Sequence, residues 1–155
     1  MTQTIPKKEF ELFDASSYKI GIVVGMFNDE ITSKLLQSAK EMCTRYSISE
    51  ENISVYHVAG CVEIPAILKA LAQKEEKYDC LVALGAIIRG DTPHFDYVAK
   101  IISEGVLRVT LDHTIPIGFG VLTCENIEQA QVRTHTGGAA VEAALQSAKI
   151  LTTII

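Results

Sequence analysis

The stretch CLVALGAIIRGDTPHFDYV, from Cys80 to Val98, contains a continuous apolar run followed by a helical spacing of apolar residues, and these two patterns decide the fold. Its first nine residues are almost continuously apolar, which is typical of a strand buried on both faces of a sheet. After the polar residues Arg89 to His94, apolar side chains return from Phe95 onward at three- and four-residue steps, which indicates a helix. Thr92 suits the N-cap of this helix and Pro93 its first position. The stretch therefore predicts a buried strand, a charged loop and a helix.

The same alternation runs along the rest of the chain. Three more stretches read as strands: KIGIVVG (19–25), ISVYHVAG (53–60) and IPIGFGVL (115–122). Helical spacing predicts helices over 31–46, 63–77, 126–133 and from 139 to about 151, besides the helix from Phe95, which continues past Gly105. We expect Asn28 or Asp29 to cap the first of these, Pro65 to lie in the first turn of the second, and Asn126 to cap the third.

Strands that alternate with helices predict an α/β fold. Nearly continuous apolar strands joined by helical crossovers form a parallel sheet with helices on both faces. We therefore expect a three-layer α/β/α structure around a four-stranded parallel sheet, of the flavodoxin-like or Rossmann-like kind. A chain of 155 residues is most simply a single domain, here 1–155, with residues 1–17 as an extended N-terminal segment.

Composition excludes several classes of function. With 48% hydrophobic and 21% charged residues the chain has the composition of a globular protein rather than a disordered one. Its net charge of -5 and scattered Lys and Arg argue against nucleic acid as a partner. We find neither a signal peptide nor a membrane-spanning stretch and expect a cytoplasmic protein without a membrane partner. Four cysteines without a Cys-x-x-Cys pair predict reduced thiols and no structural metal.

The predicted topology selects four loops as candidate sites. Ligands of open parallel sheets bind beyond the carboxyl ends of the strands, where the loops that lead into the helices gather. These loops are Met26 to Glu30, Gly60 to Pro65, Gly85 to His94, and Thr123 to Asn126. The Gly-x-Gly of GFGVLT lies inside a predicted strand, so it does not support a dinucleotide fingerprint.

The loop before the helix at Phe95 has the features of an anion site. The first backbone N–H groups of a helix, here at Asp91 and Thr92, have no intrahelical acceptor and lie at the positive end of the dipole. Ordinary capping by Thr92, with Asp91 as a favourable acid, is the alternative. His94 can carry protons near neutral pH, or it is a simple surface histidine. For Arg89 we prefer a structural ion pair.

Other candidates lie in the neighbouring loops, each with a simpler alternative. Phe27 is a stacking surface or a hydrophobic staple. Glu63 accepts hydrogen bonds from a polyol or an amine, or it complements the helix dipole. Cys61 is a nucleophile with His94 as its base, or a small buried thiol. Arg133 is a phosphate clamp or a C-terminal cation.

Five stretches together resemble the lumazine synthase family: GIVVGMFNDEITSKLL, VAGCVEIP, ALGAIIRGDTPHFDYVA, PIGFGVLTCENIEQA and GGAAVEAAL. The resemblance runs from Lys19 to Leu145 and is most specific between Gly85 and Tyr97. It implies a transferase that condenses a ribitylaminouracil with a four-carbon sugar phosphate, the penultimate step of riboflavin biosynthesis, with no cofactor and no metal.

The resemblance also assigns roles to residues. It implies that Phe27 stacks on the pyrimidine, that His94 moves protons, and that Phe119 reaches into a neighbouring subunit's site. It implies that the substrate bearing the ribityl chain contacts six residues, Cys61, Val62, Glu63, Ala86, Ile87 and Ile88. Asp91 and Thr92 would present backbone N–H groups to the phosphate, with Arg133 opposite.

The chain departs from the family pattern at two places. Val62 stands where the family usually has an aromatic residue. The turn THTGGAAV after Arg133 is shorter than the family's and lacks its lysines, so Arg133 or His135 would carry more of the phosphate contact.

The resemblance implies a homopentamer with sites at subunit interfaces, an icosahedral capsid, and riboflavin synthase as a partner. We expect the N-terminal segment to add an edge strand to a neighbouring subunit. The alternatives are a non-catalytic flavin- or lumazine-binding module and a small thiol hydrolase built on Cys61 and His94.

Overall fold

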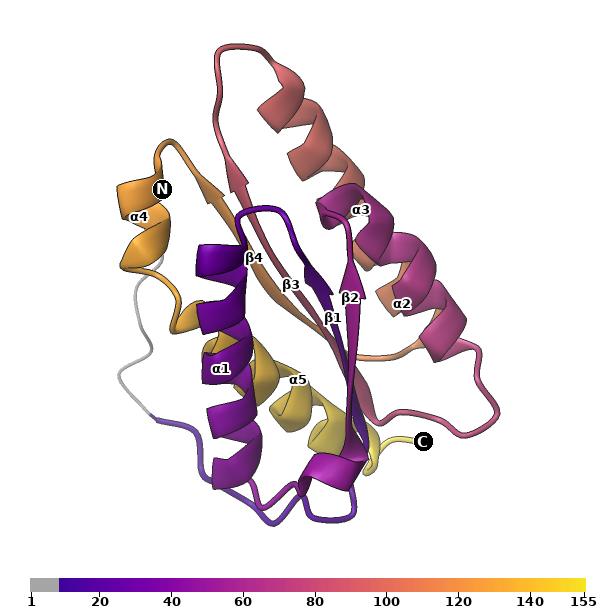
Figure 1. The fold of residues 1–155 in the computed structure, drawn as a ribbon. Coiled ribbons are helices and arrows are strands. Elements are labelled where there is room, and N and C mark those ends of the chain that lie inside the picture. Colours follow the sequence, from indigo (N-terminus) through magenta and orange to yellow (C-terminus); the bar gives the residue numbers. More distant parts are fainter. Residues whose placement is uncertain (1–8) are drawn as a thin grey trace.

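The structure, a computed structural model, describes residues 9–155 and contains, within them, one four-stranded sheet (Figure 1). The strands are β1 (Ile20–Gly25), β2 (Ile53–Val58), β3 (Cys80–Ile88) and β4 (Ile117–Cys124), in the spatial order β2-β1-β3-β4. All three pairings are parallel. The predicted parallel sheet is confirmed, with β3 extending to Ile88.

Helices cover both faces of this sheet, which confirms the three-layer prediction (Figure 1). They are α1 (Asp29–Arg45), α2 (Ile64–Ala72), α3 (His94–His113), α4 (Ile127–Gln131) and α5 (Thr136–Leu151), with short 3-10 turns η1 (Glu50–Asn52) and η2 (Cys61–Glu63). α1 and α5 pack on one face, and α2 and α3 pack on the other. Each βα loop therefore opens at the same edge of the sheet.

Two apolar clusters form the core, one on each face of the sheet. Successive side chains of a strand point to opposite faces, so Ile22 and Val24 pack with α1 and α5 whereas Val23 packs with α2 and α3. Every residue of β1 is buried. This burial on both sides explains why the strand sequences are nearly continuous in apolar residues.

Several predicted boundaries were shifted. β4 begins and ends two residues later than the predicted 115–122. α2 ends at Ala72, because the polar residues that follow offer no apolar side to bury against the sheet. α5 begins at Thr136, before the predicted Ala139, because Gly137 and Gly138 are buried against α1 and packing there outweighs their low helix propensity.

Of the three predicted caps, one is at its position without a cap hydrogen bond, one was wrong and one is confirmed. Asn28 is the N-cap residue of α1 in a left-handed conformation, with φ 60° and ψ 49°, but its side chain donates to the carbonyl oxygen of Ala86 at 3.0 Å and makes no cap hydrogen bond. Asp29 lies inside α1. α3 begins at His94 with Pro93 as its N-cap, so Thr92 is not the cap and Pro93 is not the first helical residue. Asn126 caps α4 by accepting from Gln129 N at 2.9 Å.

The predicted N-terminal segment, 1–17, lies partly outside the described residues. From residue 9 to 17 the chain has no helix or strand. It packs on its own subunit, since Ala15 N donates to the carbonyl oxygen of Tyr46 at 2.9 Å and the Phe13 ring meets the Tyr46 ring edge-on. The predicted edge strand in a neighbouring subunit stays a prediction. Among residues 9–155, no helix has the length and apolar character needed to cross a membrane.

A close crossing of α5 over α1 fixes the start of α5. A Cβ atom on Gly137 would overlap the backbone carbonyl of Leu35. Beside it, Gly138 N donates to Ser38 Oγ at 2.9 Å. The two glycines therefore let the helices approach closely enough to share a backbone-to-side-chain hydrogen bond.

We predict that Gly137→Ala lowers the free energy of unfolding by about 1–3 kcal/mol, because the added methyl group forces α5 away from the α1 backbone. Gly90→Ala is the matched control, since no described atom lies within 4 Å of a Cβ there. Its effect should stay within about 0.5 kcal/mol. Urea unfolding followed by circular dichroism measures both, and equal stabilities for the two variants would contradict the prediction.

Candidate functional site

Hydrogen bonds join the β1–α1 loop to the ends of β2 and β3 at the carboxyl edge of the sheet. Phe27 N donates to the carbonyl oxygen of Ala59 at 3.0 Å, and Met26 N donates to that of Val58 at 2.9 Å. These bonds tie the β1–α1 loop to the end of β2, while the Asn28 amide ties it to Ala86 in β3. The predicted gathering of the loops is thus present within one chain.

The Phe27 ring lies against the backbone of Gly60. A Cβ atom at Gly60 would overlap this ring, and Glu63 Oε1 lies 3.5 Å from the same position. The Phe27 side chain is 68% exposed, so its outer face is open to a ligand rather than packed on α1. The structure therefore places an open aromatic ring beside a carboxylate. The contact with Gly60 was missed, because nothing in the sequence says which glycine a ring will cover.

Cys61 is buried behind that surface. Its sulfur lies beside Gly85, where any Cβ atom would overlap it, and Ala86 N donates a hydrogen bond to it. Burial raises the pKa of the Cys61 thiol to about 11, despite that hydrogen bond, which lowers it. These features match the small buried thiol, not the activated nucleophile. Val62 and Glu63, which follow in the same turn, are exposed.

The end of β3 forms the wall between these groups and β4. Ala86 and Ile87 are buried and Ile88 is half-buried. They pair in register with Leu122, Thr123 and Cys124 of β4. The side chains of Ala86 and Ile87 are therefore packed within the sheet layers, and that of Ile88 is partly open.

The charged loop after β3 is open to solvent. Asp91, Thr92 and His94 are exposed, and within residues 9–155 the backbone N–H groups of Asp91 and Thr92 have no protein acceptor. His94 N lies 3.4 Å from Thr92 Oγ1, a long contact that holds the turn. His94 begins the 20-residue α3, so its ring stands at the positive end of that helix dipole.

Arg89 forms the structural ion pair that the sequence favoured. Its Nε donates to Glu125 Oε2 at 2.8 Å, and its Nη2 donates to Asp96 Oδ1 at 3.3 Å. The guanidinium carbon also lies 4.3 Å from the centre of the Phe95 ring. The hydrogen bond to Asp96 raises the pKa of Arg89 further, so this residue is always charged.

Arg133 lies close to the end of β4. Its Nη1 donates to the carbonyl oxygen of Gln129 at 2.7 Å, which fits the C-terminal cation of α4. Burial raises the pKa of the Cys124 thiol and the positive charge of Arg133 lowers it, so the guanidinium acts on the end of β4. Cys124 is also where Arg89 N donates its backbone hydrogen bond, at 2.9 Å. The charged loop is thus tied to the end of β4, which the charge of Arg133 also reaches.

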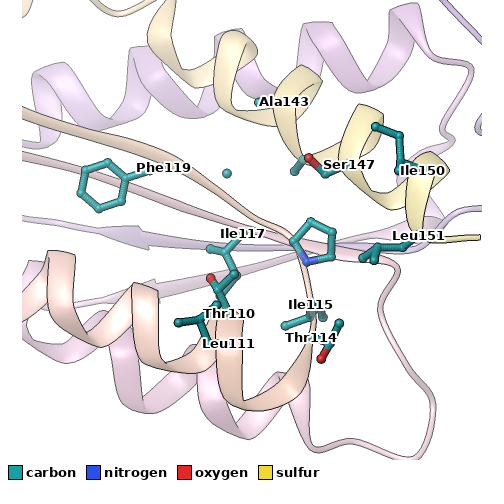
Figure 2. A pocket seen from close by; sticks show the side chains of 13 residues that line it. Thr110, Leu111, Thr114, Ile115, Ile117, Phe119, Ala143, Ser147, Ile150 and Leu151 are labelled. Carbon is teal, nitrogen blue, oxygen red and sulfur yellow. The ribbon is translucent and has the colours of Figure 1, made fainter. Parts of the chain in front are cut away.

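Phe119 is the one predicted site residue that lies apart from the others. It pairs with Ala83 in the sheet, five positions before the pair of Ile88 with Cys124. Its half-exposed ring lines an apolar groove of about 510 Å³ that runs over β4 between α3 and α5 (Figure 2). Leu111, Ile117 and Ile150 line the same groove. This groove was not predicted from the sequence. A signal was present, because α3 carries more apolar residues than one buried face needs, and Leu107 and Leu111 are left exposed.

Comparison with known families identifies the chain. The family model described as 6,7-dimethyl-8-ribityllumazine synthase matches residues 17–152 of the 155. The chain therefore belongs to the lumazine synthase family.

We predict that Cys61 reacts slowly with iodoacetamide. With a pKa of about 11, only about one Cys61 thiol in a thousand is ionised at pH 8, and the thiolate is the reactive form. Alkylation in the folded protein should be at least about 100-fold slower than in the urea-unfolded control and should accelerate as the pH approaches the pKa. Mass spectrometry of the Cys61 peptide measures the alkylation rate. Rapid labelling at pH 8 would contradict this prediction and support the alternative of a thiol hydrolase.

Proposed function

We propose that this member of the family condenses 5-amino-6-(D-ribitylamino)uracil with 3,4-dihydroxy-2-butanone 4-phosphate to form 6,7-dimethyl-8-ribityllumazine, phosphate and water. The observation that carries the proposal is the gathering of an open aromatic ring, a carboxylate, a histidine and two backbone N–H groups that have no acceptor within residues 9–155, all at one edge of the sheet. This is the penultimate step of riboflavin biosynthesis and needs no cofactor. We propose a cytoplasmic location, which the four free cysteines support.

The uracil substrate would occupy the surface around Phe27. The exposed ring offers a flat apolar face to the pyrimidine, and stacking of this kind favours flat ligands. Glu63 would accept hydrogen bonds from the ribityl hydroxyl groups, beside Cys61 and Val62. The backbone of Ala86, Ile87 and Ile88 would contact the ring from the β3 side. Because Val62 is aliphatic, Phe27 supplies the stacking ring of these loops, and the contact usually made by an aromatic residue at position 62 would be looser or rebuilt by a neighbouring subunit.

The phosphate would bind at the charged loop. The N–H groups of Asp91 and Thr92 have no protein acceptor among the described residues and stand before α3, whose dipole favours an anion at that end. Arg133 would keep its Nη1 hydrogen bond to the Gln129 carbonyl oxygen and donate its other N–H groups to the phosphate. His135, exposed in the shortened turn, is a second cation when protonated.

The reaction requires the protein to position the two substrates against each other and to transfer protons. The amine of the uracil is already a nucleophile, so the site must hold it against the ketone. His94 would move protons during imine formation, elimination of phosphate and ring closure. The negative charge that grows on the departing phosphate is matched in advance by the N–H groups and Arg133, which lowers the barrier to elimination.

We also propose that copies of the chain assemble into a homopentamer whose sites lie at the interfaces. A site in which Phe27 is 68% exposed cannot exclude water by itself. The apolar groove over β4 and the exposed Leu107 and Leu111 of α3 form an uncovered surface of the kind that marks a protein interface. Within residues 9–155, β4 pairs only with β3, so its other edge is open as well. Phe119 would then meet a neighbour's site.

The direct test mixes the purified protein with both substrates and follows the fluorescence of the lumazine product. We expect a rate well above the spontaneous condensation. A rate equal to that of the buffer control, together with tight binding of the product, would support the non-catalytic binding module instead.

We predict that His94→Ala lowers the turnover number by about 100-fold, the lower end of what general acid-base groups contribute. The KM values should change only a few-fold, because the ring acts on protons rather than on binding. His113→Ala, at the opposite end of the same helix, is the control. An unchanged turnover number in His94→Ala would refute the assignment.

We predict that Leu111→Asp separates the oligomer into smaller species, since a carboxylate in the apolar groove would be buried without a partner. Ser33→Asp, exposed on α1, is the control for an added surface charge. Sedimentation velocity measures both. The assembly proposal fails if the unaltered chain sediments as a monomer, or if Leu111→Asp leaves the oligomer intact.

A further inference from the structure

The side chain of Arg89 joins two elements that carry different halves of the proposed phosphate site. Its guanidinium donates to Asp96, in the first turn of α3, and to Glu125, in the turn between β4 and α4. It also lies over the ring of Phe95, next to His94. Both of its carboxylate partners are thus separated from it along the chain, by 7 and 36 residues.

The connection continues from Glu125 to Arg133. Glu125 N donates to the side-chain oxygen of Gln129 at 2.8 Å, and the carbonyl oxygen of Gln129 accepts from Arg133 at 2.7 Å. Gln129 is held in turn by the Asn126 cap. An unbroken series of short polar contacts therefore links the start of α3 to the guanidinium of Arg133.

The loop that follows Arg89 has little packing of its own. Gly90 has no described atom within 4 Å of a Cβ position, and Asp91 and Thr92 are exposed. Among the described residues, the polar ties of this segment are the Arg89 backbone bond to Cys124, the Arg89 side chain, the long contact between His94 and Thr92, and the bond from Asp96 N to the carbonyl oxygen of Pro93 at its end. The position of the free N–H groups thus depends on how Arg89 is held.

We propose that Arg89 is a positioning residue that sets the separation between the N–H groups of Asp91 and Thr92 and the guanidinium of Arg133, so that both reach one phosphate group. This proposal rests on the proposed function. Arg89 acts through its neighbours, because its guanidinium is already engaged by two carboxylates and an aromatic ring. A misplacement of about 1 Å at such a site is enough to cost much of the rate.

The exposure of the ion pairs supports a role in geometry rather than in stability. The Arg89 side chain is 37% exposed, and those of Asp96 and Glu125 are 60% exposed. Exposed ion pairs contribute little to the stability of a fold. Two carboxylates on one planar guanidinium, however, fix direction as well as distance, which a lysine cannot do.

A simpler role for Arg89 would be to supply positive charge near the phosphate. The variant Glu125→Gln distinguishes this charge role from the positioning role. If charge alone matters, removing the Glu125 carboxylate makes the site more positive and tightens phosphate binding. If positioning matters, the same change weakens the link between Arg89 and α4 and loosens phosphate binding. The two roles therefore predict opposite signs.

The experiment compares Arg89→Met, Arg89→Lys, Glu125→Gln and the double variant Arg89→Met with Glu125→Gln. Arg108→Met, which removes an exposed charge in the middle of α3, is the control. We expect Arg89→Met to raise the KM for the sugar phosphate about tenfold and leave the KM for the uracil unchanged. Glu125→Gln should raise the same KM, Arg89→Lys should restore it only in part, and the double variant should match Arg89→Met, since both act through one link.

A second measurement does not depend on catalysis. Inorganic phosphate is titrated into the isotope-labelled oligomer while the amide signals of Asp91 and Thr92 are followed. We expect saturable shifts in the unaltered chain, about tenfold weaker binding in Arg89→Met, and thermal midpoints within a few degrees of each other. A lumazine rate at background with these phosphate results intact would overturn the proposed reaction alone. Tighter phosphate binding in Glu125→Gln, unchanged binding in Arg89→Met, or no saturable shifts in the unaltered chain would overturn the positioning role.

Discussion

The burial of β3 between two parallel neighbours is the constraint on which the rest of the structure depends. A strand covered on both faces must be apolar throughout, and parallel neighbours require crossover helices, so all carboxyl ends meet at one edge. β3 pairs with β1 only as far as Leu84 but with β4 as far as Ile88. Its last four residues therefore project beyond β1, where Asn28 reaches Ala86, and the chain leaves the sheet beside Cys124. The candidate site begins where the apolar run ends.

The fold was predictable because it follows from periodicity, whereas the helix ends were not, because they depend on partners distant in the sequence. All four strands and their parallel direction follow from apolar runs that alternate with helical spacing, whereas their spatial order does not. Asn28 makes no cap hydrogen bond because its amide finds an acceptor 58 residues away, and α5 starts early because Gly137 meets the α1 backbone. Asn126 was predicted correctly because its partner, Gln129, lies three residues along the chain. Local sequence patterns therefore predict hydrogen bonds between residues that are close in the sequence, and not those between distant ones.

The candidate site shows the same division. The topology rule brings Phe27, Glu63 and the charged loop to one edge, and the structure has them there. The rule does not say which side chains are in contact. The packing of the Phe27 ring on Gly60 and the hydrogen bond from Arg89 to Glu125 could therefore be found only in the structure. The buried thiol of Cys61 illustrates the physical reason. Its pKa is decided by burial behind β3, which no neighbour in the sequence reveals.

The separation of Phe119 from the other site residues bears on the symmetry of the proposed assembly. One chain carries an open site at the carboxyl edge of the sheet and an apolar groove nearer the other end of β4. A two-fold contact would pair the groove with itself and leave the site open. A contact that sets the groove of one copy against the site of the next uses two different patches, and such head-to-tail contacts form a ring when the rotation between copies closes, as a five-fold rotation does. A ring would bring Phe119 to a neighbour's site in every copy, so the parts that one chain holds apart become complete only together.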